Sequence, residues 1–283
     1  MMARQSASRW SRWPGVVLGW LACSEVPVPP GSRVPEAQSP LARGASVAND
    51  AVPPRSGPPQ TLVRPPPPDY EQADLDAGND LLVAPPAPIS DCEARLERAG
   101  INYKPAELPF RTEKSRREGR AEVVSCGAEQ VVVYLGGPAG IKYNTAPTLT
   151  CRLALALAHF ESIAQEQAEQ HLLQRIVRFK HLGTYSCRKM VRFDFVSEHS
   201  YANAIDIAEV VLERGQVLSV KRHFGALAAR SVTREAAFLR SLATRSFDER
   251  VFSTVLTPYW DNLHADHFHL DLARYRVDGT RAE

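Results

Sequence analysis

The chain has 283 residues, with 34 Lys and Arg against 32 Asp and Glu, and a formal net charge of +2 at pH 7. So balanced a charge gives no electrostatic reason to bind nucleic acid or an acidic membrane surface. We therefore expect no nucleic-acid partner.

The first 23 residues have the layout of a secretory signal. Basic residues precede the apolar run 15–23, and a polar, proline-rich stretch follows. The run is shorter than the about 20 apolar residues that a membrane-spanning helix needs. Cys23 also resembles the acylated cysteine of a bacterial lipoprotein, although Trp20 stands where that signal usually has Leu. We predict export to the periplasm or cell envelope, with membrane anchoring through Cys23 or cleavage without lipid as the two alternatives.

The segment that follows, residues 24–88, is rich in proline. Sixteen of the 22 prolines lie between Pro27 and Pro88. Such a segment buries too little apolar surface to offset its ordering entropy, so we predict a disordered, partly polyproline-II tether. The folded domain should begin near Ile89 or Cys92 and run to about Arg276, that is, residues 89–276 with a tail at 277–283.

Local patterns in the domain predict its elements in chain order. The N-terminal half should hold a short helix at 92–99, extended chain at 101–108, a strand at 130–135 and a long helix at about 150–172, capped by Thr148 or Thr150. The C-terminal half should hold a strand within 175–188, a hairpin of 204–212 and 217–224, a helix at 233–243 and a strand at 251–256. Hairpins replace βαβ crossovers, which predicts an α+β fold with a small, mainly antiparallel sheet and flanking helices.

Four cysteines lie in the predicted domain: Cys92, Cys126, Cys151 and Cys187. They are too widely separated for a zinc knuckle, and export would place them in an oxidising compartment. We therefore predict two structural disulfides. Three pairings are possible, and we favour the one that joins neighbours along the chain, Cys92–Cys126 and Cys151–Cys187.

His199 and Asp206 form the first group of residues able to carry chemistry. They are seven residues apart, and an odd spacing on one regular strand would turn their side chains to opposite faces. They can converge only if the chain bends between them, with a loop leading into a strand at Ala204. Taken alone, this pair would be an ordinary loop histidine and a half-buried aspartate.

The second group is the stretch 264-HADHFHLDLA-273, which contains three of the eight histidines of the chain. In a strand, His267, His269 and Asp271 would share one face, and the apolar residues between them the other. A polar strand face is usually only solvated. Catalytic zinc sites, however, use imidazole and carboxylate ligands, three in number plus a water, and His199, Asp206 and one of these histidines supply that set. Asp271 would not bind the metal itself but would orient one of these histidines through a ring nitrogen.

The stretches SEHxxxNAIDI at 197–207 and HADHFHLDL at 264–272, with TLTC at 148–151 and TYSCR at 184–188, resemble the bacterial extensin-like C-terminal domain family. The resemblance covers about residues 90–276. That family in turn resembles the zinc peptidases that include D-alanyl-D-alanine carboxypeptidases and the penicillin-insensitive murein endopeptidase. It implies a fold like that of these peptidases, a Zn²⁺ cofactor and peptidoglycan peptides as substrate.

Carried over by position, the resemblance assigns roles to individual residues. Zinc would be bound by His199, Asp206 and His269. His267 would stabilise the transition state or move a proton, and Arg188 would hold a substrate carboxylate. Ser197 would support the loop or touch substrate, while His264 is either a further pocket histidine or a hydrogen-bonded loop residue.

Two departures from the peptidase pattern affect the expected activity. Ala202 stands where the pattern has Gly, so a positive φ there would carry strain. No glutamate of an ExxH element precedes His269, so an endopeptidase is the better expectation than a D,D-carboxypeptidase. The alternative is a non-catalytic peptidoglycan-binding or structural envelope module. An intracellular metal sensor conflicts with the export signal. We expect a monomer.

Overall fold

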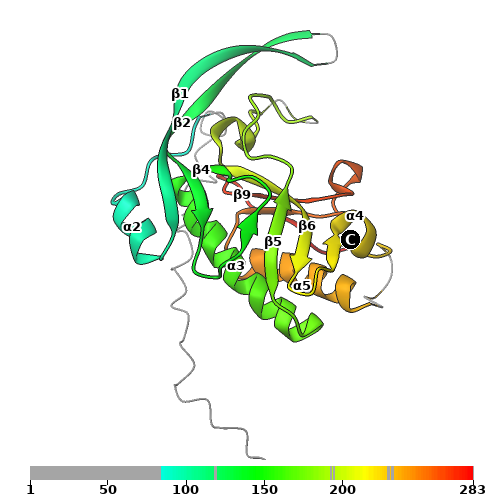
Figure 1. The fold of residues 1–283 in the computed structure, drawn as a ribbon. Coiled ribbons are helices and arrows are strands. Elements are labelled where there is room, and N and C mark those ends of the chain that lie inside the picture. The colour runs from blue at the N-terminus through cyan, green and yellow to red at the C-terminus, as the bar shows by residue number, and fades with distance from the viewer. Residues whose placement is uncertain are drawn as a thin grey trace, which may run out of the picture. The chain divides into compact units, whose positions relative to one another are not determined.

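The computed structural model describes residues 84–282, apart from 118–119, 192, 194, 228–229 and 231–232. The predicted signal segment with Cys23, and nearly all of the predicted tether, lie outside the described residues. The elements that position the site are introduced below with their bounds, and Figure 1 shows their arrangement. Within the described part of the chain, no helix is long and apolar enough to cross a membrane.

A seven-stranded sheet carries the site. Its strand order is β10-β8-β9-β6-β5-β3, and β7 also pairs with β6. The strands are β3 (Lys142–Tyr143), β5 (Ile176–His181), β6 (Ala204–Leu212), β7 (Val217–Ser219), β8 (Thr254–Leu256), β9 (Phe268–Asp271) and β10 (Val277–Gly279). β6 is central because it pairs antiparallel with β5 on one edge and with both β9 and β7 on the other.

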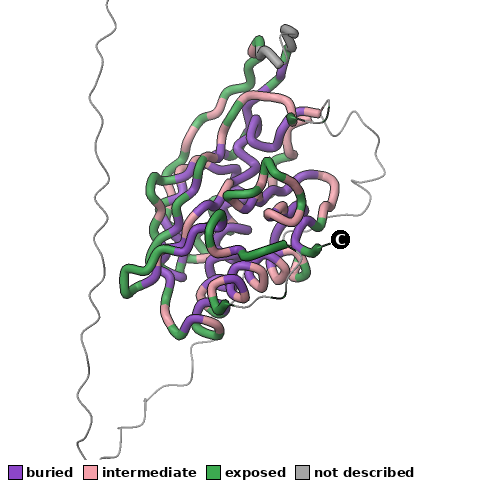
Figure 2. Tube along the Cα trace, turned by 90° about the vertical axis from the view of Figure 1, so that its right-hand side faces the viewer, coloured by how far each residue is buried: buried purple, intermediate pink, exposed green. Residues whose placement is uncertain are grey.

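Two helices, α3 (Cys151–Leu172) and α5 (Arg234–Asp248), pack against each other and against the sheet (Figure 1). Their apolar faces join the sheet in one continuous core, in which Phe160, Phe179, Phe238 and Phe252 are fully buried. Figure 2 shows buried segments running through the middle of the domain. Burying each such aromatic side chain stabilises the fold by about 1.5–3 kcal/mol.

A second, three-stranded sheet consists of β1 (Asn102–Arg117), β2 (Arg120–Gly136) and β4 (Thr148–Thr150). β1 and β2 form a long curved hairpin that extends beyond the rest of the domain (Figure 1). β4 pairs with β2 only at the base of this hairpin. β1 is an edge strand, which is where Pro105 and Pro109 can be accommodated without loss of a ladder hydrogen bond.

The predicted α+β class with a mainly antiparallel sheet is confirmed. The helix predicted at 92–99 is α2 (Cys92–Arg98), and α3 begins after Thr150, whose side chain accepts a hydrogen bond from the Leu153 N–H at 3.3 Å. Thr150 is therefore the cap, not Thr148. β6 begins at Ala204, as the predicted loop-to-strand transition required.

Besides the longer β1–β2 hairpin, three segments differ from the prediction. Residues 220–223 form the short helix α4 (Val220–His223) instead of extending the hairpin, because Val220 and Phe224 are four apart and both buried. The strand predicted within 175–188 ends at His181, and residues 184–188 bond to a helical turn instead. Residues 277–279, expected in the tail, form β10 and pair parallel with β8, so the domain extends past Arg276.

Two disulfides are present, as predicted, but the predicted pairing is wrong. The bonds join Cys92 to Cys151 and Cys126 to Cys187. α2 packs against α3, which brings the first residues of both helices together, with a Cα–Cα distance of 6.1 Å. Cys126 on β2 likewise faces the loop after β5. Neighbours in the chain are not neighbours in space here, because each bond links elements separated by a whole strand pair or helix.

Glu161 is a buried carboxyl in the middle of α3. The hydroxyls of Tyr134 and Tyr143 donate to its Oε1 at 2.9 and 2.8 Å. Burial raises the pKa of Glu161 from its ordinary 4.5 to about 7, although these hydrogen bonds act in the opposite direction. A Cβ atom at Gly137 would lie 2.5 Å from the Tyr134 hydroxyl and 2.8 Å from Glu161 Oε2, so glycine is needed beside the carboxyl.

We predict that Glu161 makes the protein less stable as the pH rises from 4.5 to 7. The folded chain holds the proton more tightly than the unfolded chain, so this contribution to stability is complete below pH 4.5 and is lost as the pH approaches 7. The shift corresponds to roughly 3 kcal/mol at most. Urea unfolding at several pH values should show a smaller decline for Glu161→Gln, whose amide has no charge to bury.

Glu169→Gln is the matched control, since Glu169 is exposed on the same helix. Other titrating groups affect the two variants alike. Parallel stability curves for wild type and Glu161→Gln across this pH range would contradict the prediction.

Candidate metal centre

His199 lies in a short helical turn, η2 (Glu198–Tyr201), and its side chain is buried. The segment 184–188 runs against this turn: the Ser186 N–H donates to the carbonyl oxygen of His199 at 3.0 Å. His199 Nδ1 lies 3.4 Å from the carbonyl oxygen of Thr184. A carbonyl can only accept, so this contact places the ring proton on Nδ1 and leaves the lone pair of Nε2 directed at the site.

Asp206 on β6 and His269 on β9 are directly opposite each other in the antiparallel ladder. Their side chains therefore share one face of the sheet, and His269 Nδ1 lies 3.0 Å from Asp206 Oδ1. His269 Nε2 is 2.9 Å from Asp271 Oδ2. Asp271 is itself buried and accepts a hydrogen bond from the Ala273 N–H at 3.0 Å. The predicted orienting role of Asp271 matches this arrangement.

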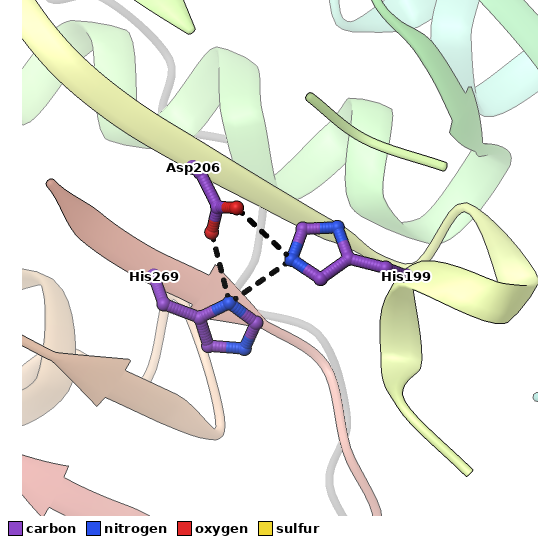
Figure 3. A group of neighbouring side chains, drawn as sticks. All are labelled: His199, Asp206 and His269. Atoms are coloured by element: carbon purple, nitrogen blue, oxygen red, sulfur yellow. Dashed lines mark hydrogen bonds and ion pairs between the residues drawn. The ribbon is translucent and has the colours of Figure 1, made fainter. Parts of the chain in front are cut away.

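The three side chains converge on one point, as Figure 3 shows. His199 Nε2 is 3.2 Å from His269 Nδ1 and 3.3 Å from Asp206 Oδ2. One ligand atom from each residue lies within 4.8 Å of the others. Ligands at about 2.0–2.1 Å from a tetrahedral zinc ion are about 3.3–3.4 Å apart. The donor set and its spacing therefore fit Zn²⁺.

The charges of Asp206 and His269 also favour a cation between the ligand atoms. Burial alone would raise the pKa of Asp206, but its interactions with the neighbouring imidazoles of His199 and His269 outweigh burial, and that pKa lies well below its usual value. Burial would lower the pKa of His269, but hydrogen bonds to Asp206 and Asp271 outweigh it and raise that pKa to about 10. A proton on His269 and a metal ion thus compete for the same place between the ligand atoms.

Two more histidines lie beside the ligand group. His267 precedes β9, with Nε2 at 3.7 Å from Asp206 Oδ1 and Nδ1 at 2.8 Å from Asp266 Oδ1. His264 is held by Asp261, whose Oδ1 is 2.7 Å from His264 Nδ1, and its ring centroid is 5.9 Å from that of His269. The structure therefore brings all three histidines of the 264–273 stretch to one site.

Ser197 and Arg188 line the same cavity of about 300 Å³ as Asp206 and His269. The Ser197 N–H donates to the carbonyl oxygen of Arg188 at 3.0 Å, and the Arg188 N–H donates to Ser200 Oγ at 2.9 Å. The backbone of Arg188 is thus fixed on both sides. Its guanidinium forms no ion pair with any residue that the structure describes, and it donates only to the Lys189 carbonyl at 3.4 Å.

Sequence reasoning missed Asn203 and Glu198, although both belong to the stretch SEHxxxNAIDI. Asn203 is fully buried, and its Nδ2 donates to Glu198 Oε2 at 2.7 Å and to the Leu272 carbonyl at 3.0 Å. Its Oδ1 accepts from the Thr150 hydroxyl at 3.0 Å. Burial, and then the charge of Asp271, raises the pKa of Glu198 to about 8. An Asn between a histidine turn and a strand was the available signal.

The bend between His199 and Asp206 occurs at Ala202, whose φ of 52° and ψ of 32° are left-handed. The N–H of Ala202 donates to the His199 carbonyl at 3.2 Å, and its own carbonyl accepts from the Thr150 N–H at 2.9 Å. The strain expected for a residue other than glycine is therefore present, at about 1–2 kcal/mol. The chain nevertheless makes the turn that the two ligands need to converge.

The fold and the site define an α+β domain with a partly buried His-Asp-His group whose donor atoms are close enough to hold a metal ion. The extensin-like protein C-terminus family matches residues 90–281, which is more than half of the chain and includes every residue of the site. The protein belongs to this family. Neither the curated proteins nor the solved structures contain a match to the chain.

We predict that Asn203→Ala lowers the free energy of unfolding by roughly 3 kcal/mol, since it removes three buried hydrogen bonds and leaves Glu198 and Thr150 without that partner. Chemical denaturation of the intact protein measures this. Asn262→Ala is the control, because Asn262 is exposed on the turn η3 (Asn262–His264), and it should change stability by less than about 0.5 kcal/mol. A loss below about 1 kcal/mol for Asn203→Ala would argue against its bracing role.

Proposed function

We propose that the protein is a zinc-dependent peptidase of the cell envelope that hydrolyses amide bonds in peptidoglycan peptides. The observation that carries this proposal is the convergence of His199, Asp206 and His269, each histidine having its second ring nitrogen fixed by an oxygen acceptor. Catalytic zinc sites use three protein ligands and orient them in this way. The resemblance to murein endopeptidases and D-alanyl-D-alanine carboxypeptidases supplies the substrate class.

Zinc held by His199, Asp206 and His269 would supply a water of lowered pKa and polarise the carbonyl of the scissile amide. The chain itself supplies the remaining groups. His267 lies beside Asp206 at the cavity, and we propose that it donates a hydrogen bond to the oxyanion or a proton to the leaving amine. Arg188 offers its guanidinium to a substrate carboxylate. Ser197 and His264 shape the cavity wall.

The proposal includes an exported location, in the periplasm or envelope, with Cys23 as a lipid anchor or the segment cleaved without lipid. We also propose that the protein is a monomer. Endopeptidase activity is preferred to D,D-carboxypeptidase activity because no ExxH glutamate precedes His269.

A second function is a non-catalytic module that binds peptidoglycan or has a structural role in the envelope. The left-handed strain at Ala202 favours it, because the peptidase pattern has glycine there. The complete ligand group opposes it. The two functions differ in turnover and not in fold.

The first test of the proposal is metal content. After incubation with zinc and dialysis, elemental analysis should find one zinc per intact chain for the wild type. His199→Ala and His269→Ala each remove one of three ligands and should retain less than about a tenth of this amount. His223→Ala is the control, because His223 lies on α4 and bonds locally to Ser219. Substoichiometric zinc in the wild type would rule out the metal site.

The second test is turnover. Zinc-loaded protein should release peptide fragments from purified peptidoglycan sacculi. His267→Gln should lower kcat by about 10²–10⁴-fold while zinc content stays unchanged, since His267 is not a ligand in the proposal. Bound zinc without any release of fragments would favour the non-catalytic module.

A further inference from the structure

Four large apolar side chains are exposed around the cavity of the metal centre. Val191 and Phe193 belong to the loop after β5, and we call them the first lip. Trp260 and Leu263 belong to the loop after β8, and we call them the second lip. Between 41% and 55% of the surface of each residue is exposed, and all four line the cavity that also contains Asp206 and His269.

The position of the lips distinguishes them from ordinary surface apolar residues. Single exposed hydrophobic residues are common and need no explanation, whereas a cluster around a concave site marks a binding surface. The lips come from loops about 70 residues apart in the chain, and both border one cavity. The lining of that cavity thus combines two of the proposed ligand residues with exposed apolar side chains.

The charges of the cavity show what kind of group suits the lips. The carboxylates of Asp206, Asp261 and Asp271 are each paired with a histidine, and Glu198 accepts from Asn203. Among the described residues that line the cavity, no carboxylate lacks a partner, and Arg188 supplies a guanidinium. The lips themselves present apolar surface. A neutral, apolar group gains most from this surface, because binding removes apolar area of both partners from water.

The size of the cavity limits the occupant. Its volume of about 300 Å³ is at the lower end of small-molecule sites. It suits one or two residues of a peptide and is too small for a helix or a folded partner. Continuity with the ligand atoms places that group next to the bond that would be hydrolysed.

We propose that the two lips bind a neutral apolar side chain of the peptide substrate, adjacent to the amide presented to His199, Asp206 and His269. This assignment rests on the proposed peptidase function, and it adds that the substrate is selected by an apolar residue. The lips hold this side chain by desolvation, while the polar interior of the cavity faces the peptide bond.

The test measures the fluorine NMR signal of Trp260 during ligand titration. The chain has four tryptophans, so the intact protein labelled with 5-fluorotryptophan gives four fluorine signals, and the Trp260→Phe variant identifies the one from Trp260. N-acetyl glycinamide, N-acetyl leucinamide and N-acetyl phenylalaninamide are titrated in the presence of a chelator. The Trp260 signal should shift with the leucine and phenylalanine probes at concentrations at least about tenfold lower than with the glycine probe.

The variant Leu263→Ser removes part of the second lip and should reduce the preference for leucine over glycine to less than about threefold. Leu182→Ser is the control, because Leu182 is similarly exposed but does not line the cavity. Circular dichroism checks that both variants fold. The phenylalanine preference should fall in parallel with that for leucine.

Equal midpoints for the three probes would overturn the inference, as would a preference that survives Leu263→Ser. A Trp260 signal that shifts only with phosphatidylcholine–phosphatidylglycerol vesicles would also overturn it, because the lips would then contact a membrane. The probes have no metal-binding group and need no turnover. A leucine preference without zinc binding therefore supports the lips and refutes the peptidase, and zinc-dependent hydrolysis without the preference does the reverse.

Discussion

The geometry of the site depends on one buried amide. Asn203 receives a hydrogen bond from Thr150 at the start of α3, and donates to Glu198 in η2 and to the Leu272 carbonyl just after β9. It therefore joins the helix, the turn that carries His199 and the strand that carries His269. Asn203 is also one residue before β6, so its position in turn constrains Asp206. A side chain with fewer donors and acceptors could not satisfy all three partners without water.

The stretches that surround this amide in space are separate in the chain. TLTC provides Thr150 and the disulfide of Cys151, which fix the start of α3 against Asn203. TYSCR provides Thr184, whose carbonyl contacts His199 Nδ1, and Cys187, whose disulfide links that segment to β2. Neither stretch contributes a ligand atom. Both stretches fix the turn between β5 and β6 and so orient the His199 ring toward Asp206 and His269.

Much of the site could be predicted because it depends on local periodicity. The alternation of 267–272 separates the polar from the apolar face, and the spacing of His199 and Asp206 demands the bend that occurs at Ala202. The disulfide pairing could not be predicted in this way, because it depends on how α2 packs on α3. The length of the β1–β2 hairpin was also missed, since the sequence 111–122 consists almost entirely of polar residues and has no period-two alternation of apolar residues.

Ala202 shows how the structure accommodates a departure from a pattern. Its left-handed conformation costs about 1–2 kcal/mol. Around it, the Ala202 N–H and carbonyl are both bonded, and the neighbouring Asn203 makes three buried hydrogen bonds, each contributing about 1 kcal/mol. The surrounding contacts therefore exceed the strain, and the ligand atoms of His199 and Asp206 stay within 3.3 Å of each other. Alanine at this position lowers stability without displacing a ligand. The strain at Ala202 alone therefore does not displace the ligand group, and the proposed hydrolysis would depend also on the cavity residues His267 and Arg188 and on the apolar lips.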